Sequence, residues 1–196
     1  MTTRLLISKA LTAAVVCSTL IAKQQYPENP SIEFAFDATG MLLVSAAALG
    51  RAWSAVFVSG RKSVELITDG PYSIVRNPLY FFSFLGFIGV GLLLQSFILA
   101  AALTVIFFLT HWPTILREET KLRGIFGEPF DDYLKSVPRF IPRLSLYRCR
   151  DTAEFAPKVF TKAVLESMML LAVIPLTEAL ELLRKSDILP ALLPMY

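Results

Sequence analysis

Cysteine and histidine are scarce in this chain, which has two cysteines and one histidine among its 196 residues. Cys17 and Cys149 lie far apart in the sequence, so they form neither a disulfide framework nor the Cys-x-x-Cys pair typical of metal sites. Charged residues make up only 18% of the chain, and the formal net charge is +3. We therefore expect no resident metal ion and no nucleic-acid partner.

Apolar residues are abundant where charged residues are few. They make up 55% of the chain, and the mean hydropathy of +0.58 is too high for a soluble domain. A helix that crosses about 30 Å of hydrocarbon needs about 20 apolar residues. The candidate stretches are residues 5–22, 34–58, 79–116 and 159–183. They predict an all-α integral membrane protein with about five transmembrane or interfacial helices; whether the first and last stretches cross completely stays open, because both contain charged residues.

The third stretch, residues 79–116, is too long for a single crossing, because at 1.5 Å per residue it would extend about 55 Å. The polar pair Gln95-Ser96 divides it, which predicts a tight antiparallel helical hairpin. Such a hairpin returns the polar segments on either side of it to the same membrane face. Lysine and arginine crowd into residues 61–76 and 117–162, so the positive-inside rule places this face in the cytoplasm.

These patterns divide the chain into three parts. Residues 1–64 hold the N-terminal transmembrane helices, residues 65–142 form a core around the hairpin, and residues 143–196 hold a basic linker and a last apolar helix. After the hairpin, residues 118–127 predict an amphipathic continuation, and a second short helix is predicted to begin near Pro129. We expect both to lie on the cytoplasmic surface.

Short motifs flank the hairpin on both sides. They are Gly70-Pro71-Tyr72, Arg76-Asn77-Pro78-Leu79-Tyr80, Glu118-Glu119, and Phe126-Gly127-Glu128 followed by Tyr133. Their order and spacing over residues 65–142 resemble the membrane methyltransferases of the isoprenylcysteine carboxyl methyltransferase family, with phosphatidylethanolamine methyltransferases as more distant relatives.

The resemblance implies that S-adenosylmethionine binds in a pocket open to the cytoplasm. The positions that match the family's cofactor-binding residues are Glu65, Leu66, Ile67, Tyr72, Arg76, Asn77, Pro78, Leu79, Tyr80 and Glu118. The chemistry of the cofactor agrees with this set. Its ammonium and sulfonium groups suit a carboxylate such as Glu118, and its carboxylate suits a donor such as Asn77 or Arg76.

The chain also departs from the family at two places. Asn77 replaces the usual histidine, which is also the pattern of phospholipid methyltransferases. Thr114 falls where the isoprenylcysteine enzymes have an arginine that contacts the substrate. Arg117 is the candidate replacement, although it lies on a different face of the helix.

The acceptor decides whether a catalytic base is needed. A carboxylate acceptor needs none, whereas an amine must lose a proton, and Glu119 and His111 are the nearest candidates for a base. Structural roles are the alternatives: Arg76 can extend toward the membrane surface, the glutamate pair can begin the cytoplasmic region, and His111 can simply be packed.

We therefore expect an S-adenosylmethionine-dependent methyltransferase that acts on a lipophilic membrane acceptor, most similar to protein-S-isoprenylcysteine carboxyl O-methyltransferase. Its substrate is then a lipophilic small molecule or a lipid-modified molecule, and membrane lipids surround it. The first alternative is a phospholipid N-methyltransferase of the phosphatidylethanolamine type, and the second is a non-catalytic membrane scaffold or transporter. The acceptor, the membrane and the oligomeric state stay open.

Overall fold

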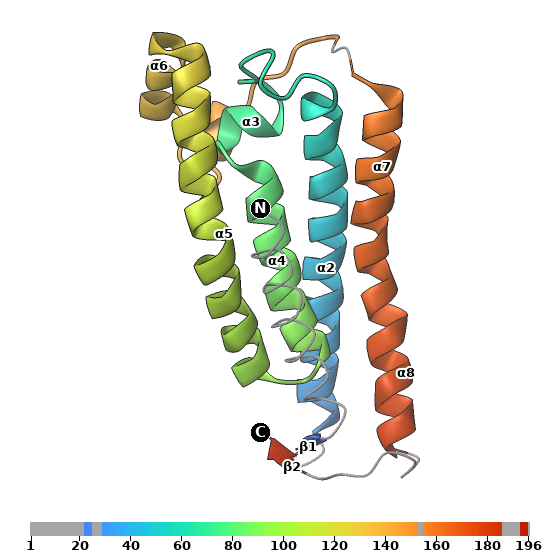
Figure 1. The fold of residues 1–196 in the computed structure, drawn as a ribbon. Helices are drawn as coiled ribbons and strands as arrows, with labels where there is room; N and C mark the ends of the chain where they lie inside the picture. The colour runs from blue at the N-terminus through green and yellow to red at the C-terminus, as the bar shows by residue number, and fades with distance from the viewer. Residues whose placement is uncertain (1–21, 25–28, 153–154, 186–192, 196) are drawn as a thin grey trace. The chain divides into compact units, whose positions relative to one another are not determined.

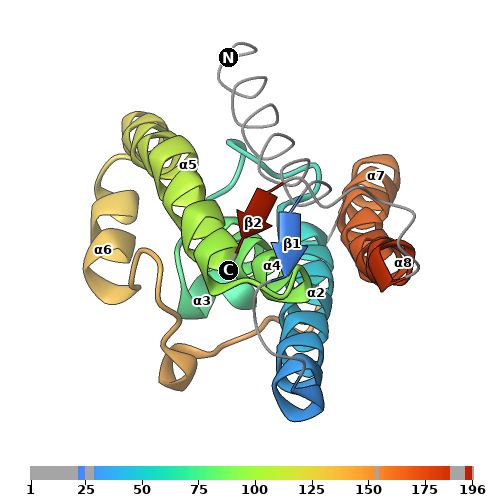
Figure 2. The ribbon, with the colours of Figure 1, turned by 90° about the horizontal axis from the view of Figure 1, so that it is seen from below.

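The structure is a computed structural model that describes residues 22–24, 29–152, 155–185 and 193–195. The long helices are α2 (Pro30–Val58), α4 (Pro78–Leu93), α5 (Phe97–Phe126), α7 (Pro157–Met168) and α8 (Val173–Lys185), and the short ones are α3 (Pro71–Ile74), α6 (Glu128–Ser136), η1 (Leu144–Leu146) and η2 (Met169–Ala172) (Figure 1). Strands β1 (Ala22–Gln24) and β2 (Leu193–Met195) form a short parallel ladder, seen as two adjacent arrows in Figure 2. The rest of the described chain has no strand, and the prediction of an all-α membrane protein is confirmed. Residues 5–21 of the first expected crossing lie outside the described residues.

Three helical stretches are long and apolar enough to cross a membrane: α2, α5 and residues Pro157–Leu183. Helix α4 is apolar but shorter, with 16 residues. Helix α5 has 30 residues and is therefore about 45 Å long, which exceeds the roughly 30 Å of bilayer hydrocarbon. Helix α5 is therefore longer than one crossing needs, and its charged residues, the glutamate pair among them, lie in its C-terminal part.

The chain forms two compact units, which we describe separately. Unit 1 comprises the described parts of residues 1–45, 85–110 and 170–196, and unit 2 comprises residues 46–84 and 111–169. Helices α2, α4 and α5 each contribute one part to unit 1 and the other part to unit 2. All the motif residues that flank the hairpin belong to unit 2.

The turn of the hairpin lies in unit 1. Gln95 adopts a left-handed backbone conformation with φ of 58°, and its N–H donates to the carbonyl oxygen of Leu92 at 2.7 Å. The Ser96 hydroxyl oxygen then accepts the N–H of Leu99 at 3.2 Å and caps the first turn of α5. This geometry confirms the tight turn predicted at Gln95-Ser96.

Close helix packing near this turn depends on Gly91. A Cβ atom added to Gly91 would lie only 2.3 Å from the Cα of Ala100, so no larger residue fits without a shift of α4 or α5. Leu92 and Ala100 form a buried cluster with Phe36 of α2. The hairpin is therefore packed backbone to backbone at its closed end.

Unit 2 contains α6, which packs beside the last turns of α5 (Figures 1 and 2). Phe130 and Tyr133 of α6 are buried, and Leu122 of α5 packs against them. Gly127, with φ of 61°, separates the two helices, and Pro129 lies in the first turn of α6. The two helices match the amphipathic continuation and the second short helix that the sequence predicts after the hairpin.

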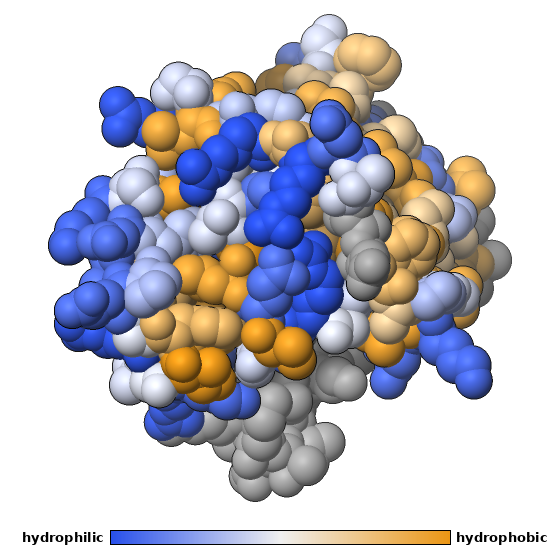
Figure 3. Space-filling view, turned by 90° about the horizontal axis from the view of Figure 1, so that it is seen from above, coloured by the Kyte–Doolittle hydropathy of each residue, from blue (hydrophilic) through white to orange (hydrophobic). Residues whose placement is uncertain are grey.

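Residues 137–152, here called the strap, run along the loop of residues 65–77. Backbone hydrogen bonds join the two segments: Arg76 N–H to Pro138 O at 2.9 Å, Arg143 N–H to Ile74 O at 2.9 Å, and Gly70 N–H to Arg148 O at 2.8 Å. Figure 3 looks onto unit 2 from above and shows hydrophilic side chains gathered across the middle of this face, with hydrophobic ones among them. The backbone hydrogen bonds of the strap therefore hold the 65–77 loop in place.

Candidate functional site

The two adjacent glutamates of α5 have different environments. Neighbouring residues of a helix point about 100° apart, so Glu118 and Glu119 face different neighbours. The Glu118 side chain is 32% exposed, whereas that of Glu119 is 9% exposed. The structure thus separates one accessible carboxylate from one buried carboxylate.

Glu119 is the centre of a buried polar cluster with Arg76, Asn77 and Arg139, here called the Glu119 cluster. Its Oε1 accepts a hydrogen bond from Asn77 Nδ2 at 3.0 Å, and its Oε2 lies 3.0 Å from Arg139 Nε and 3.5 Å from Arg76 Nη1. Both carboxylate oxygens therefore already have donors within the protein. The cluster joins α5 to the start of α4 and to the strap.

Asn77 makes two kinds of contact. Its side-chain Nδ2 donates to Glu119 and also to the Arg139 carbonyl oxygen at 3.1 Å. Its own carbonyl oxygen accepts the N–H groups of Tyr80 and Phe81, so the residue also begins α4, with Pro78 at the first helical position. Asn77 is therefore part of the structural network that fixes the loop, and within the described residues that network uses Nδ2 of its side chain and not Oδ1.

Glu118 belongs to a second, more accessible group with Lys62, Tyr72 and Tyr80, here called the Glu118 cluster. Lys62 Nζ lies 3.0 Å from Glu118 Oε1, and the Tyr80 hydroxyl is hydrogen-bonded to the same carboxylate. Burial raises the pKa of Tyr72 well above its ordinary value, and the nearby Tyr133, Glu118 and Tyr80 add to the shift. The Tyr72 hydroxyl therefore stays protonated and able to donate a hydrogen bond.

Residues 65–67 present backbone rather than side chains. The Glu65 carboxylate is bound by Arg61 and Arg150, whose hydrogen bonds lower its pKa. The Leu66 side chain packs against α6, and Ile67 is buried. Within the described parts of the chain, no hydrogen bond engages the backbone of Leu66 or Ile67. These backbone groups are free to bind a ligand.

An aromatic group adjoins both clusters. His111 lies edge-on to Tyr80 with 5.9 Å between ring centroids, and it has further contacts. Phe140 of the strap is surrounded by Phe81, Phe84 and Trp112. Arg117 is exposed and does not belong to either cluster. The structure thus brings His111 near the Glu118 cluster and leaves Arg117 apart from it.

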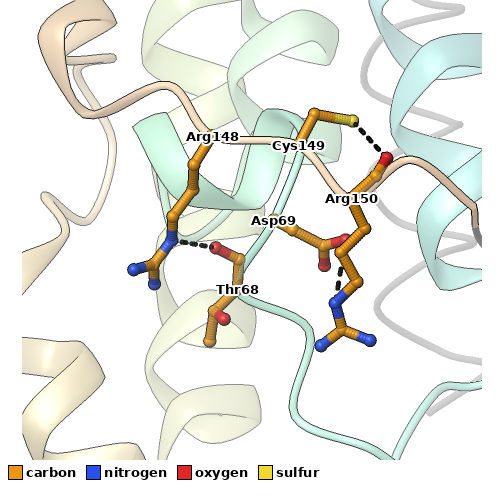
Figure 4. A pocket seen from close by; sticks show the side chains of 5 residues that line it. All are labelled: Thr68, Asp69, Arg148, Cys149 and Arg150. Atoms are coloured by element: carbon orange, nitrogen blue, oxygen red, sulfur yellow. Dashed lines mark hydrogen bonds and ion pairs between the residues drawn. The ribbon is translucent and has the colours of Figure 1, made fainter.

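An open pocket marks the contact between the strap and the 65–77 loop. It is lined by Thr68, Asp69, Arg148, Cys149 and Arg150 (Figure 4). Arg148 Nε donates to the Thr68 carbonyl oxygen at 3.2 Å, and Arg150 Nε faces the buried Asp69 carboxylate at 3.5 Å. Its charged groups face one another across the pocket, so we regard it as a junction that positions the loop.

The motif region matches a known family. A family model described as phospholipid methyltransferase matches residues 35–129. The protein-S-isoprenylcysteine O-methyltransferase of Schizosaccharomyces pombe is 33% identical over 94 residues, which cover 47% of this chain and 40% of that protein. The chain belongs to the isoprenylcysteine carboxyl and phospholipid methyltransferase family. The resemblance expected from the motifs is confirmed, and we describe the chain below as a membrane methyltransferase.

Two bacterial relatives match this methyltransferase over more of its length. The nickel-cobalt-cadmium resistance protein NccN of Alcaligenes xylosoxydans xylosoxydans is 38% identical over 177 residues, covering 90% of this chain and 83% of that protein. The cobalt-zinc-cadmium resistance protein CzcN of Cupriavidus metallidurans is 35% identical over 156 residues, covering 80% of this chain and 72% of that protein. No solved structure matches the chain. In the described residues, no group of three or more His, Cys, Asp or Glu side chains could hold a metal ion.

The chemistry of the Glu118 cluster fits S-adenosylmethionine, the cofactor expected for this methyltransferase. Glu118 offers an accessible carboxylate to a cationic group, and its lysine partner is itself exposed. Tyr72 offers a neutral donor, and the backbone of residues 66 and 67 offers unused donors and acceptors of the kind that a purine ring binds. The residues present therefore suit a ligand with a positive charge and a polar ring.

Sequence reasoning missed three residues. Lys62 pairs with Glu118, Arg139 pairs with Glu119, and Arg51 lies inside α2 with a hydrogen bond to Ser83. Arg51 could have been singled out from the sequence, because it is the single charged residue in the apolar stretch of residues 38–58. Lys62 and Arg139 had none beyond their charge, because their partners are distant in the sequence.

Proposed function

We propose that this membrane methyltransferase transfers the methyl group of S-adenosylmethionine to a lipophilic acceptor on the cytoplasmic side of the membrane. The observation that supports this most is the accessible carboxylate of Glu118 beside the hydroxyls of Tyr72 and Tyr80. The bound cofactor supplies a methyl group on a sulfonium, which needs no further activation. In this proposal the end of α5 lies at the membrane surface, where a cytosolic cofactor can meet an acceptor from the bilayer.

In this proposal the chain's own residues bind the cofactor, position the two reactants and exclude water from the site. Glu118 would release its exposed partner Lys62 and pair with the cationic part of the cofactor. The protonated Tyr72 hydroxyl would donate a hydrogen bond to the cofactor. The Glu119 cluster holds the loop to α5, because the buried Glu119 carboxylate is paired with Arg76 and Arg139. The aromatic side chains around Phe140 limit the entry of water from the bilayer side. Catalysis in this proposal is mainly alignment of the two reactants.

A base is needed only for an amine acceptor. The Glu119 carboxylate already accepts hydrogen bonds from three side chains of the protein, which occupy both of its oxygens. His111 lies beside Tyr80 and is the better candidate to accept the proton. Asn77 and the phospholipid methyltransferase match favour an amine of a phospholipid as the acceptor, whereas the isoprenylcysteine relative favours a carboxylate.

Mass spectrometry of lipid extracts tests the proposal directly. Purified protein is incubated with methyl-deuterated S-adenosylmethionine and either phosphatidylethanolamine or an S-prenylcysteine analogue. We expect one of the two acceptors to gain a deuterated methyl group, and heat-inactivated protein to give none. Binding of the cofactor without transfer to either acceptor would favour a different lipophilic acceptor, and absence of cofactor binding would favour a scaffold or transporter.

Glu118 and Glu119 give a matched pair of variants for cofactor binding. Glu118→Gln should raise the dissociation constant of S-adenosylmethionine about tenfold to a hundredfold, because a charge-assisted contact contributes about 1.5–3 kcal/mol. Glu119→Gln should instead lower the thermal stability in detergent, because it leaves two guanidinium groups without their carboxylate. Calorimetry and thermal unfolding measure the two effects. Equal affinities in the two variants would contradict the assignment of Glu118 to the cofactor.

The relatives named for metal resistance suggest a second test in cells. We propose that any share of this chain in metal resistance depends on methyl transfer, since its described residues offer no metal-binding cluster. Growth in nickel, cobalt or cadmium is compared for cells that carry the wild type and the Glu118→Gln variant at equal protein levels. Equal growth of both strains above the empty control would contradict this link.

A further inference from the structure

Arg51 is a charged side chain within a helix that can span the membrane. Helix α2 ends at Val58, so Arg51 lies about 10 Å inside that end at 1.5 Å per residue. Its partner Ser83 lies five residues into α4, a similar distance of about 8 Å from the start of that helix. An ionised group at such a depth is unfavourable unless it faces a partner or a wet cavity.

The hydrogen bonds of Arg51 leave most of its donors unused. Its Nη1 donates to the Ser83 hydroxyl oxygen, and that hydroxyl in turn donates to the Leu79 carbonyl oxygen at 2.7 Å. The Nε of Arg51 is buried and has no hydrogen-bond acceptor among the residues that the structure describes. Ser83 therefore orients the guanidinium but cannot neutralise it, because a hydroxyl carries no charge.

No carboxylate compensates for the charge of Arg51 in the part of the chain that the structure describes. Arg51 forms no ion pair there, and Glu166 of α7 acts on it only at longer range. Glu166 is itself 56% exposed and lies 4.0 Å from Lys162. Arg51 is half-buried and has no carboxylate partner among the described residues, so an anion from outside the chain is a suitable partner for its guanidinium.

The location connects Arg51 to the Glu118 cluster. Ser83 follows Tyr80 by three residues on α4, so the two side chains lie on neighbouring positions of one helix face, about 4.5 Å apart along its axis. Tyr80 contacts Glu118, and Ser83 contacts Arg51. The Arg51 guanidinium is therefore about one helical turn deeper in the bilayer than the proposed cofactor carboxylate.

We propose that Arg51, oriented by Ser83, binds the anionic headgroup of a membrane amphiphile through its phosphate or carboxylate. A guanidinium offers a planar pair of donors that matches both groups, and partial burial strengthens the contact. The headgroup binding stands on the geometry of Arg51 alone. Its role in holding the methyl acceptor rests on the proposed function.

A structural role is the rival explanation. In that case the hydrogen bond of Arg51 to Ser83 only ties α2 to α4, and substitutions change stability without changing ligand binding. The two explanations differ in what a folded variant retains, so the test measures binding on protein that is monodisperse in detergent.

The experiment is native mass spectrometry of purified protein, without S-adenosylmethionine, mixed with dioleoylphosphatidic acid, an S-prenylcysteine or neutral dioleoylglycerol. We expect the wild type to retain at least one of the two anionic amphiphiles more strongly than dioleoylglycerol. Arg51→Gln should lower that retention at least tenfold, because a charge-assisted contact is lost. Arg51→Lys should retain the anionic amphiphile less than the wild type and more than Arg51→Gln. Ser83→Ala should lower retention severalfold, because the guanidinium loses the hydroxyl that orients it.

Arg143→Gln is the matched control, because Arg143 is an exposed arginine of the strap and the change in net charge is the same. It should retain the ligand like the wild type. Equal retention of all three amphiphiles, or unchanged retention in Arg51→Gln, would overturn the proposal. If Arg51→Gln does not fold, unchanged retention in both Arg51→Lys and Ser83→Ala would overturn it.

Preference for phosphatidic acid indicates a phosphate ligand, and preference for S-prenylcysteine indicates a carboxylate; both support the site. Arg51-dependent retention in a protein that transfers no methyl group would overturn the proposed function and leave this site intact.

Discussion

Asn77 has a structural role in the Glu119 cluster and, in our proposal, a second role in binding the cofactor. Its Nδ2 is used by Glu119 and by the Arg139 carbonyl oxygen, which leaves Oδ1 for a ligand. We expect Asn77→Ala to lower the free energy of unfolding by about 1–3 kcal/mol, because a buried carboxylate loses a donor. The dissociation constant of S-adenosylmethionine should also rise, about twofold to tenfold, from the loss of a neutral hydrogen bond. Thermal unfolding and calorimetry on the same preparation measure both quantities.

Asn77→His is the companion variant, because it restores the family's usual residue. We expect it to retain cofactor binding and to gain a pH dependence near an imidazole's pKa of about 6.5. Unchanged cofactor affinity in folded Asn77→Ala would limit Asn77 to its structural role.

At the scale of elements, Gly91 and Gly124 differ in whether their surroundings leave room for a side chain. Gly91→Ala should lower the free energy of unfolding by about 1–3 kcal/mol, since its Cβ would collide with the backbone of Ala100. Gly124 of α5 has nothing within 4 Å of an added Cβ. Gly124→Ala should therefore raise the stability by about 0.5–1 kcal/mol through helix propensity. Thermal unfolding of both variants checks the pair, and a gain in stability for Gly91→Ala would refute the close packing.

The attachment of the strap to the 65–77 loop should depend on pH. The pKa of Glu65 lies below its ordinary 4.5, chiefly because Arg61 and Arg150 donate to its carboxylate. A lowered pKa means that the stabilisation is present above the ordinary carboxyl pKa and is lost as the pH falls through the lowered value. We therefore expect the strap to loosen as the pH falls below the ordinary carboxyl pKa. The effect should be modest and sensitive to salt, because the pair is well exposed.

Hydrogen exchange of the Gly70 amide reports this attachment, since that N–H donates to the Arg148 carbonyl oxygen. Its protection should fall in acid in the wild type. In Glu65→Gln the protection should be lower at neutral pH and should lack the acid step. An identical pH profile in the two proteins would show that Glu65 does not hold the strap.

At the scale of the whole molecule, the basic segments on either side of the hairpin should lie in the cytoplasm. Val64 is 79% exposed, and the native Cys149 is exposed as well, so both can be labelled as cysteines. In intact bacterial cells, an impermeant thiol reagent should label Val64→Cys and Cys149 only after the membrane is permeabilised. Ser31→Cys, at the other end of α2, should be labelled without permeabilisation. Each engineered cysteine is tested in a Cys17→Ser background, with Cys149→Ser added for the two new sites. Labelling of Val64→Cys from outside would reverse the topology.

The sequence by itself determined the class of the protein, its hairpin and its family. Length and hydropathy of apolar stretches are local properties, so α2, α5 and the turn at Gln95 could be predicted from residue order alone. The motifs that reveal the family are also short and contiguous.

Only the tertiary structure decided which side chains meet. It buried Glu119 between Arg76 and Arg139 while leaving Glu118 accessible, although the two glutamates are neighbours in the sequence. It also placed Arg51 against Ser83, 32 residues away. Such contacts depend on how helices rotate and pack against one another, and the direction in which a side chain points is set by the packing of its whole helix.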